Sequence, residues 1–258
     1  MSQVIMITSG KGGVGKSTVC ANLGMKLALD GYKVCMIDAD IGLKNLDIMM
    51  GLENRIMYDM SDVIHGVCSI EKAMIRDKHC RNLYLLPSCK TMQIERVSAQ
   101  DMQLVVKELR QLFDYILIDS PAGIETGFHH ALNCSTMAIV VVQLEITSLH
   151  DADRVIGLLH RHGLKEIKLV INRVNPELIR KQVQLKIEDA VEWLSVELLG
   201  VVYEDEKIAL SISKGNIRSQ ETSTLTHACF STMVKRLHHE LADIPKFKEK
   251  NLWQRMFS

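Results

Sequence analysis

The fold of this chain is decided by the stretch Gly10-Lys11-Gly12-Gly13-Val14-Gly15-Lys16-Ser17-Thr18. The stretch fits the pattern G-x-x-x-x-G-K-[ST], in which a glycine-rich loop joins a strand to a helix. An apolar run over residues 4–8 precedes it, and apolar residues at helical spacing follow it through Leu29. Strand, loop and helix therefore occur in the order that a phosphate-binding P-loop requires, and the sequence predicts a nucleotide site here.

Each residue type in this loop has a chemical reason to be there. Glycines let successive main-chain N–H groups converge on an anion, and the N-terminus of the following helix adds its partial positive charge. Lys16 supplies a positive charge for the β- and γ-phosphates, and Ser17 places a hydroxyl on Mg²⁺. The alternative interpretation is a glycine-rich turn that only caps a helix. The predicted nucleotide-binding residues of the loop are Gly10, Lys11, Gly12, Gly13, Val14, Gly15, Lys16, Ser17 and Thr18.

Carboxylates follow two further apolar runs. The second predicted strand leads to Asp38 and Asp40, and a later strand ends at Asp119. In open α/β folds, ligands bind at the carboxyl ends of the parallel strands. We therefore expect Asp119 to contact Mg²⁺ directly or through water, and Asp40 is well placed to orient a water molecule. Capping of the loop 41–45 is the alternative role for Asp38 and Asp40.

Most of the chain alternates short β-branched runs with helical stretches, which is typical of a parallel sheet with crossover helices. Its 258 residues are 47% hydrophobic, enough to bury a core without disulfides or a structural metal. We expect an α/β fold of the P-loop NTPase kind, a doubly wound, mostly parallel sheet flanked by helices. The expected strands are residues 4–8, 33–37, 83–86, 115–119, 137–143, 167–172 and 198–202.

Two helices are indicated by particular residues. A Ser-x-x-Asp pattern at Ser98 predicts a capped helix start. Apolar residues from Ala228 to Leu241 mark the last long helix.

Composition disfavours several classes of protein. No apolar run approaches the roughly 18 to 20 residues of a membrane-spanning helix. The N-terminus opens into an apolar strand without a charged leader. The seven cysteines are scattered without a CxxC pair, which disfavours a disulfide framework, a zinc site or an iron–sulfur site. Together these observations predict a cytoplasmic protein.

Lys11 is a second lysine inside the loop, and an ordinary P-loop does not need it. The run from Lys11 to Thr18 resembles the deviant P-loop of the ParA/MinD family of ATPases. The resemblance implies ATP as the nucleotide and a homodimer in the ATP state, in which Lys11 reaches the phosphates bound by the partner subunit. A solvated surface lysine is the alternative for Lys11.

The same resemblance assigns roles to the acidic residues. It implies that Asp40 positions the attacking water and that Asp38 helps to hold Mg²⁺. The implied catalytic residues are Lys11, Lys16 and Asp40, and the implied metal ligands are Ser17, Asp38 and Asp119.

The resemblance extends over nearly the whole chain. Residues 120–127 resemble the second switch segment of the family, and residues 151–154 resemble its helix near the partner-binding surface. The segments 41–47 and 50–55 resemble the part that follows its first switch.

The base-binding side is the part in which this sequence departs from the pattern. Asn172 and Arg173 correspond to the base-recognition position, where an amide can read adenine; a plain polar strand end is the alternative. Tyr203 stands where many relatives carry proline, and Asn216-Ile217 replaces the usual Glu-Pro. We therefore expect the adenine contacts to differ in detail.

The last residues, 246–258, differ in composition from the rest of the chain. Placed on a helix, Leu252, Trp253, Met256 and Phe257 fall within an arc of about 140° and basic or polar residues lie opposite, whereas Phe247 falls off that face. This pattern is typical of a helix lying in the surface of an anionic membrane, and a terminal helix packed on the body is the alternative. We expect a P-loop ATPase domain over residues 1–245 and a membrane-targeting amphipathic helix in residues 246–258. Its membrane-facing residues are Leu252, Trp253, Met256 and Phe257.

The resemblance also implies a function. An ATPase of this kind hydrolyses ATP slowly, as a regulatory switch, and binds the inner face of the cell membrane as a dimer. It recruits a division inhibitor to control placement of the septum, and a further protein regulates its hydrolysis or localisation.

Three other functions remain open at this point. They are a flagellar-positioning ATPase of the same family, a DNA-partition ATPase, and a metabolic P-loop ligase or kinase. DNA binding is disfavoured because DNA contacts need a basic footprint, whereas the 31 basic and 31 acidic residues cancel here.

Overall fold

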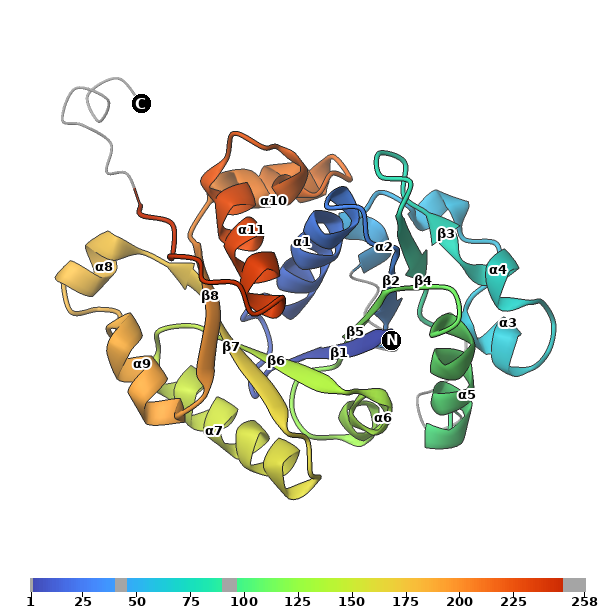
Figure 1. Cartoon of the computed structure of the whole chain (residues 1–258), viewed down its shortest axis with the longest axis horizontal. Coiled ribbons are helices and arrows are strands. Elements are labelled where there is room, and N and C mark those ends of the chain that lie inside the picture. Colours follow the sequence, from blue (N-terminus) through green and yellow to red (C-terminus); the bar gives the residue numbers. More distant parts are fainter. Residues whose placement is uncertain (1, 40–45, 90–96, 248–258) are drawn as a thin grey trace.

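The computed structural model describes residues 2–39, 46–89 and 97–247, and in these residues eight strands form one sheet. The strand order is β3-β4-β2-β5-β1-β6-β7-β8, and every neighbouring pair except β3–β4 is parallel (Figure 1). The predicted α/β class with a mostly parallel sheet is therefore confirmed. The strands are β1 (Gln3–Thr8), β2 (Val34–Asp38), β3 (Ile75–Arg76), β4 (Leu83–Leu86), β5 (Tyr115–Asp119), β6 (Met137–Val142), β7 (Glu166–Val174) and β8 (Glu197–Tyr203).

Helices cover both faces of the sheet, as right-handed crossovers between parallel strands require (Figure 1). Helices α1 and α11 pack on one face, whereas α5, α6, α7 and α9 pack on the other. The helices are α1 (Lys16–Leu29), α2 (Leu46–Met49), α3 (Met60–Ile64), α4 (Ile70–Ala73), α5 (Ala99–Leu109), α6 (Thr126–Cys134), α7 (Ile146–Arg161), α8 (Pro176–Arg180), α9 (Ile187–Leu194), α10 (Glu206–Ser213) and α11 (Leu225–Leu237).

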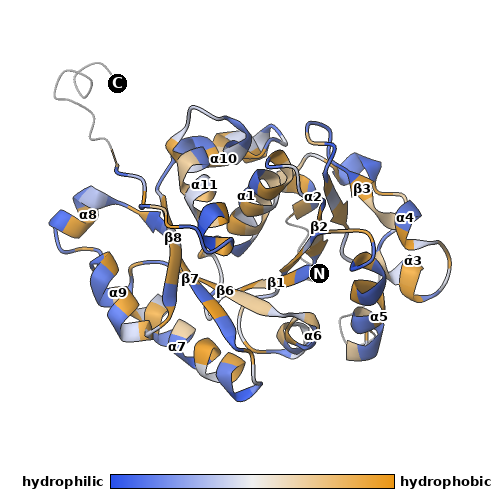
Figure 2. Ribbon diagram, in the orientation of Figure 1, coloured by the Kyte–Doolittle hydropathy of each residue, from blue (hydrophilic) through white to orange (hydrophobic). Residues whose placement is uncertain are grey.

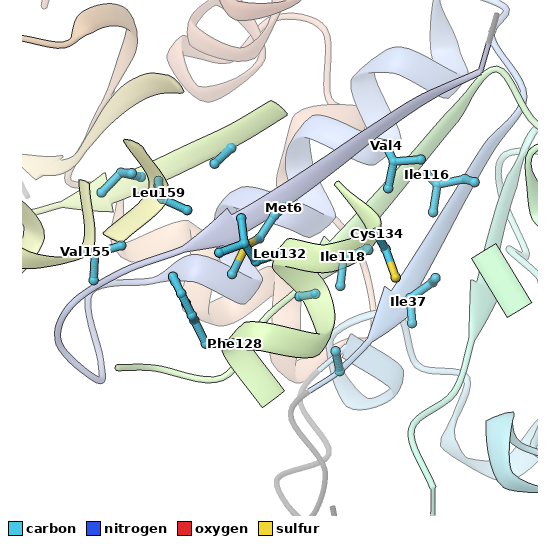
Figure 3. Close-up of a cluster of buried hydrophobic side chains, with 14 of the residues drawn as sticks. Val4, Met6, Ile37, Ile116, Ile118, Phe128, Leu132, Cys134, Val155 and Leu159 are labelled. Atoms are coloured by element: carbon cyan, nitrogen blue, oxygen red, sulfur yellow. The ribbon is translucent and has the colours of Figure 1, made fainter. Parts of the chain in front are cut away.

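The central strand β1 shows why the inner strands are apolar along their whole length. Its side chains alternate between the two faces: Val4 and Met6 enter the core under α6, near Phe128 (Figure 3). Ile5 and Ile7 enter the core under α1. A strand covered on both faces needs an apolar residue at every position, whereas the outer helices α5 and α7 carry both polar and apolar residues (Figure 2).

The capped helix that the sequence predicts at Ser98 is confirmed. The Ser98 hydroxyl accepts the Asp101 N–H at 3.1 Å, and the Asp101 carboxylate accepts the Ser98 N–H at 2.9 Å. This reciprocal pair satisfies two donors that the first turn of a helix leaves without partners.

The predicted end of the last helix is wrong. Helix α11 ends at Leu237, and Leu241 lies beyond it and is fully exposed. His238 is the C-cap, and His239 takes a left-handed backbone conformation (φ 60°), which turns the chain out of the helix. Leu241 therefore continues the apolar spacing of the sequence without continuing the helix.

Strand boundaries also differ slightly from the predicted ones, because β7 extends through Val174 and β6 ends at Val142. The short antiparallel strand β3 is an addition that the sequence did not indicate. Within the part of the chain that the structure describes, no helix is long and apolar enough to cross a bilayer. Asp40 and the tail residues Leu252, Trp253, Met256 and Phe257 lie outside the described residues, so their roles and the C-terminal helix stay predictions.

Candidate nucleotide-binding site

The P-loop runs from the carboxyl end of β1 into the N-terminus of α1. Gly15, the residue before the helix, has a left-handed backbone (φ 97°); no side chain caps the helix, and its first turn holds no acidic residue. The first main-chain N–H groups of a helix have no partner inside it, and the helix dipole makes this end positive. Lys16 is buried at this turn, whereas Ser17 and Thr18 are half-buried. The arrangement is suited to binding an anion.

Asn172 braces this loop from the carboxyl end of β7. Its buried side-chain amide donates to the Val14 carbonyl at 2.8 Å. A Cβ atom at Gly15 would lie 2.2 Å from Nδ2 of Asn172, so only glycine lets the two approach this closely. The sequence predicts base recognition or a plain polar strand end for Asn172, and no local pattern indicates its contact with the P-loop.

Asp38 and Asp119 lie side by side at the carboxyl ends of β2 and β5. The two residues are partners in the strand register, and both are buried. Cys20 of α1 lies within their electrostatic reach: burial raises the pKa of its thiol, and the charges of Asp119 and Asp38 raise it further. Cys20 is one helical turn beyond Lys16 and Ser17, so the two carboxylates lie near the phosphate end of α1.

These residues fit a magnesium ion. Carboxylates and a hydroxyl are the oxygen ligands that Mg²⁺ prefers, and Mg²⁺ is usually held by one or two carboxylates together with phosphate oxygens. Asp38, Asp119 and Ser17 supply that set of donors. The Asp38 carboxylate also accepts the main-chain N–H of Leu46 at 3.4 Å, so it joins the two ends of the segment 40–45.

The Lys11 side chain contacts the start of α7. Its ammonium lies 3.3 Å from the Glu145 carboxylate and 3.4 Å from the Thr147 hydroxyl. The side chains of Lys11 and Glu145 are 45% and 48% exposed, so water weakens their attraction. Lys11 therefore remains at the surface, where its charge is accessible to a second molecule.

The start of the segment 120–127 is attached to the P-loop strand. The Ser120 hydroxyl donates to the Ile7 carbonyl at 3.0 Å, and the Gly123 N–H donates to the Ser9 carbonyl at 3.1 Å. Beyond Gly123 the chain is exposed as far as Thr126. One end of this segment is therefore fixed beside the phosphate site, and the next residues face solvent.

Helix α7 also approaches the P-loop closely. A Cβ atom at Gly10 would lie 2.3 Å from the main-chain carbonyl of Asp151. A hollow of about 230 Å³ lies between the loop, the segment 120–127 and this helix. Its lining includes Gly10, Gly123, Asp151 and Arg154. The residues that resemble a partner-binding helix thus adjoin the residues that resemble a switch.

A second hollow, of about 260 Å³, lies beside Asn172 and Arg173, where the sequence predicts the base contacts. Arg173 has a left-handed backbone (φ 54°), and its carbonyl accepts the Gln184 side-chain amide at 3.1 Å. The predicted phosphate residue Thr18 and the predicted base residues Asn172 and Arg173 therefore meet in one place. The lining of this hollow comprises Thr18, Asn172, Arg173, Tyr203, Glu204, Asp205, Glu206, Ile208, Ala209 and Ile212.

The sequence departures have structural roles at this side of the molecule. The Asp205 carboxylate caps α10 by accepting the Lys207 N–H at 3.0 Å, and it also accepts hydrogen bonds from Arg218 and Thr226. These contacts stabilise the fold. Tyr203 donates its hydroxyl proton to a main-chain carbonyl near the end of the described chain. Ile217 is buried in the core under α1.

Known proteins match this chain over nearly its whole length. A family model described as the CobQ/CobB/MinD/ParA nucleotide binding domain matches residues 5–218. The septum site-determining protein MinD of Synechocystis is 43% identical over 246 residues, which are 95% of this chain and 92% of that protein.

Solved structures agree with these matches. In the MinC:MinD cell division protein complex of Aquifex aeolicus, one chain matches with a TM-score of 0.89 and 39% identity, covering 96% of this chain and 100% of that chain. The Pyrococcus horikoshii septum site-determining protein MinD, complexed with Mg-ADP, matches with a TM-score of 0.82 and 29% identity over 92% of this chain and 96% of that chain.

The sheet topology and the P-loop at the open end of α1 define a nucleotide-binding protein of the P-loop class. This chain belongs to the CobQ/CobB/MinD/ParA family of nucleotide-binding ATPases and, within it, to the septum site-determining MinD proteins. The resemblance inferred from Lys11 and its neighbours is therefore confirmed.

Proposed function

We propose that this chain is a Mg²⁺-dependent ATPase whose nucleotide state controls dimerisation and membrane attachment during placement of the division septum. The observation that carries the proposal is the uncapped N-terminus of α1 beside the paired carboxylates Asp38 and Asp119. The Mg-ADP complex of the Pyrococcus relative supports ATP and Mg²⁺ as the cofactors. The septum-site names of the relatives favour a role in division over flagellar positioning or DNA partition.

Different residues of the site bind the phosphates, hold Mg²⁺ and orient the attacking water. The first N–H groups of α1 and the charge of Lys16 bind phosphate oxygens and orient the γ-phosphate. Ser17, Asp38 and Asp119 are the residues that would hold Mg²⁺, which neutralises phosphate charge when it is bound. Asp40 orients the attacking water, a role that is still a prediction from the sequence.

Lys11 is the residue through which we expect a second copy of the chain to complete the site. Its ammonium is exposed, and its contacts with Glu145 and Thr147 lie at the surface. Exposed ion pairs contribute at most about 1 kcal/mol, so a triphosphate on a partner subunit competes easily for this lysine. The homodimer therefore depends on ATP, because ATP carries the anion that Lys11 binds.

Helix α7 is the surface that we propose for the division inhibitor. The Aquifex structure contains MinC together with MinD, which supports a MinC-like partner for this chain. Asp153 and Arg154 of α7 are exposed, and Asp151 contacts the P-loop at Gly10. A partner bound to α7 therefore lies close to residues that change with the nucleotide, and the same holds for a regulator of hydrolysis.

Membrane attachment is assigned to the tail. We propose an ATPase unit over residues 1–245 and a membrane-targeting tail over residues 246–258, attached peripherally to the inner face of the cell membrane. Each large apolar side chain contributes about 1.5 to 3 kcal/mol on burial, and ordering a short segment offsets much of this. One tail therefore binds weakly, whereas two tails held in a dimer gain an avidity of order 10² to 10⁴.

Lipid sedimentation tests this proposal directly. The full chain is mixed with vesicles of phosphatidylcholine and phosphatidylglycerol in the presence of ATP or of ADP. We expect at least about tenfold more sedimented protein with ATP, because only the dimer has two tails. Deleting residues 251–258 should abolish sedimentation and leave ATP-dependent dimerisation in size-exclusion chromatography unchanged.

Point variants in the tail provide the matched control. Trp253→Ala removes a side chain from the apolar face and should weaken sedimentation, whereas Gln254→Ala, on the opposite face, should not. Equal sedimentation in ATP and ADP would contradict the coupling to dimerisation. Undiminished sedimentation after the deletion would move the membrane contact to another part of the chain.

A further inference from the structure

The described chain ends in a segment that is held against the open edge of the sheet. We call residues 242–247 the strap. The Arg236 guanidinium donates to the Ala242 carbonyl at 2.9 Å, and the Thr232 hydroxyl donates to the Asp243 carbonyl at 3.3 Å. Further along, the Tyr203 hydroxyl donates to the Pro245 carbonyl at 3.0 Å. These three side chains therefore hold three main-chain carbonyls of the strap, those of residues 242, 243 and 245.

The strap passes from one face of the sheet to the other around β8. It begins after α11, whose apolar residues belong to the core under α1. Ile244 of the strap instead packs against the core on the opposite face, as does Tyr203. Strand β8 is the last in the sheet order, so among the described residues the strap covers the edge that no strand pairs with (Figure 1).

Tyr203 is the residue that holds the outer end of the strap. Its ring lies against that of Phe247, with centroids 5.3 Å apart, and the Phe247 main-chain N–H lies against its hydroxyl. Burial raises the pKa of the Tyr203 hydroxyl above its ordinary value, so the group is a protonated donor at neutral pH. If the Tyr203 contact is lost, the strap keeps its two hydrogen bonds to α11 and the packing of Ile244.

The same tyrosine lines the base-binding hollow. Tyr203 ends β8 and borders the hollow together with Asn172 and Arg173. The next residue, Glu204, accepts the Asn175 side-chain amide at 2.8 Å, which ties the end of β8 to the loop that follows β7. Tyr203 is thus among the residues that line the place for a nucleotide base, and its side chain contacts the last residues before the tail.

We propose that Tyr203 is a positioning residue through which a base bound in the hollow holds the strap in place and so fixes where the membrane tail leaves the body. The inference rests on the proposed nucleotide and membrane functions. A base in the hollow excludes water from Tyr203, and a hydrogen bond shielded from water is stronger. The bond to Pro245 and the packing on Phe247 are then more persistent with nucleotide than without it.

Fixing the strap matters because it shortens the flexible connection to the tail. When the strap is free, residues 242–247 join the linker and add about 13 Å of root-mean-square reach. A longer linker lowers the effective concentration of the second tail at the membrane.

Hydrogen exchange of the full chain tests the coupling. The amides of Ile244, Lys246 and Phe247 are followed in the free protein, with saturating ADP, and with inorganic tripolyphosphate, which has no base. We expect ADP to slow exchange in the strap about fivefold, in line with one hydrogen bond of ordinary strength. Tripolyphosphate should slow exchange in the P-loop and leave the strap unchanged.

Two variants separate the contact from folding. Tyr203→Phe removes the hydroxyl and keeps the ring, and it should abolish the effect of ADP on the strap while the P-loop stays protected. Phe247→Ala removes an exposed ring from the strap side and should have the same result. Tyr84→Phe is the matched control, because Tyr84 lies on β4 at the other end of the sheet.

The outcomes distinguish this inference from the proposed function. If ADP fails to slow exchange in the P-loop, the nucleotide site itself is wrong. If ADP protects the P-loop but leaves the strap unchanged, the coupling through Tyr203 is overturned. Equal protection of the strap by tripolyphosphate, or full protection in Tyr203→Phe, would also overturn it.

Discussion

The phosphate cradle and the base-binding hollow lie side by side in this molecule but are built in different ways. The cradle comes from one continuous stretch, residues 10–18, together with carboxylates at the ends of β2 and β5. The hollow is assembled from α1, the ends of β7 and β8, and α10. The predicted phosphate site is therefore encoded locally, whereas the predicted base site depends on how distant segments meet.

Asn172 is the residue that the two regions share. Its amide donates to Val14 in the cradle, and the same side chain lines the hollow. A change that affects only the cradle should lower the affinity for all phosphate-bearing ligands by the same factor. A change in the hollow should lower the affinity only for ligands that carry a base.

The largest effect is expected from Lys16→Ala. Lys16 is buried at the first turn of α1, and loss of a charge-assisted contact to phosphate costs about 3 kcal/mol, a factor of about 100 or more in Kd. Titration with ATP and with tripolyphosphate should show the same loss for both ligands. Lys33→Ala, which removes an exposed lysine before β2, is the control and should bind normally. A loss confined to ATP would show that Lys16 does not serve the phosphates.

Gly15→Ala should have the next largest effect, on stability as well as binding. An alanine at φ 97° is strained by about 1 to 2 kcal/mol, and its Cβ would lie 2.2 Å from Nδ2 of Asn172. Gly31→Ala is the matched control, since Gly31 has nearly the same φ (99°) and no atom within 4 Å of the added Cβ.

Thermal unfolding measures the difference between these two glycine variants. A chain of this size loses about 2 to 4 °C in Tm per kcal/mol, and Gly15→Ala should lose several degrees more than Gly31→Ala. Combining Gly15→Ala with Asn172→Ala removes the overlap, so the double variant should lose less Tm than the sum of the two single losses. Equal Tm losses in the two single variants would mean that Asn172 does not press on Gly15.

The contrast between local and assembled regions also explains what the sequence could predict. The apolar runs located seven of the strands, because buried parallel strands are apolar at every position. The loop motif located the loop that leads into α1, and the strand ends located the neighbouring residues Asp38 and Asp119. These predictions needed only neighbouring residues.

The remaining features depend on contacts between distant residues. Leu241 has the right spacing for a helix, but His239 turns the chain before it. The two residues of β3 are too few to give a pattern. The hydrogen bond between Tyr203 and Pro245 joins residues that are far apart in sequence, so no local pattern predicts it.

Asn172→Ala tests the residue that connects the two regions. The change leaves the buried Val14 carbonyl without its donor, which costs about 1 to 3 kcal/mol, and it also removes an amide from the hollow. We expect ADP affinity to fall about tenfold and tripolyphosphate affinity about threefold.

The matched control for this prediction is Asn82→Ala. Asn82 also donates its side-chain amide to a main-chain carbonyl, that of Ala28, but at 3.4 Å and away from the site. The nucleotide affinity of the Asn82→Ala variant should equal that of the unchanged chain. If Asn172→Ala lowers the affinities for ADP and for tripolyphosphate by the same factor, Asn172 only supports the P-loop. The base contact must then come from the other residues that line the hollow.

The smallest effect is expected from Glu145→Gln, which frees Lys11 without altering either binding region. The ion pair is half-exposed at 3.3 Å, and such a pair contributes at most about 1 kcal/mol, a factor of up to about five. Because Lys11 no longer has to leave Glu145 when it reaches a partner's triphosphate, ATP-dependent dimers should form about twofold more tightly in analytical ultracentrifugation. The gain in dimer affinity should be smaller at high salt, because salt screens the ion pair between Lys11 and Glu145. The control is Glu108→Gln on α5, which should leave dimer affinity unchanged. Weaker dimerisation of Glu145→Gln would instead place Glu145 in the dimer interface, where its charge helps to hold the partner subunit.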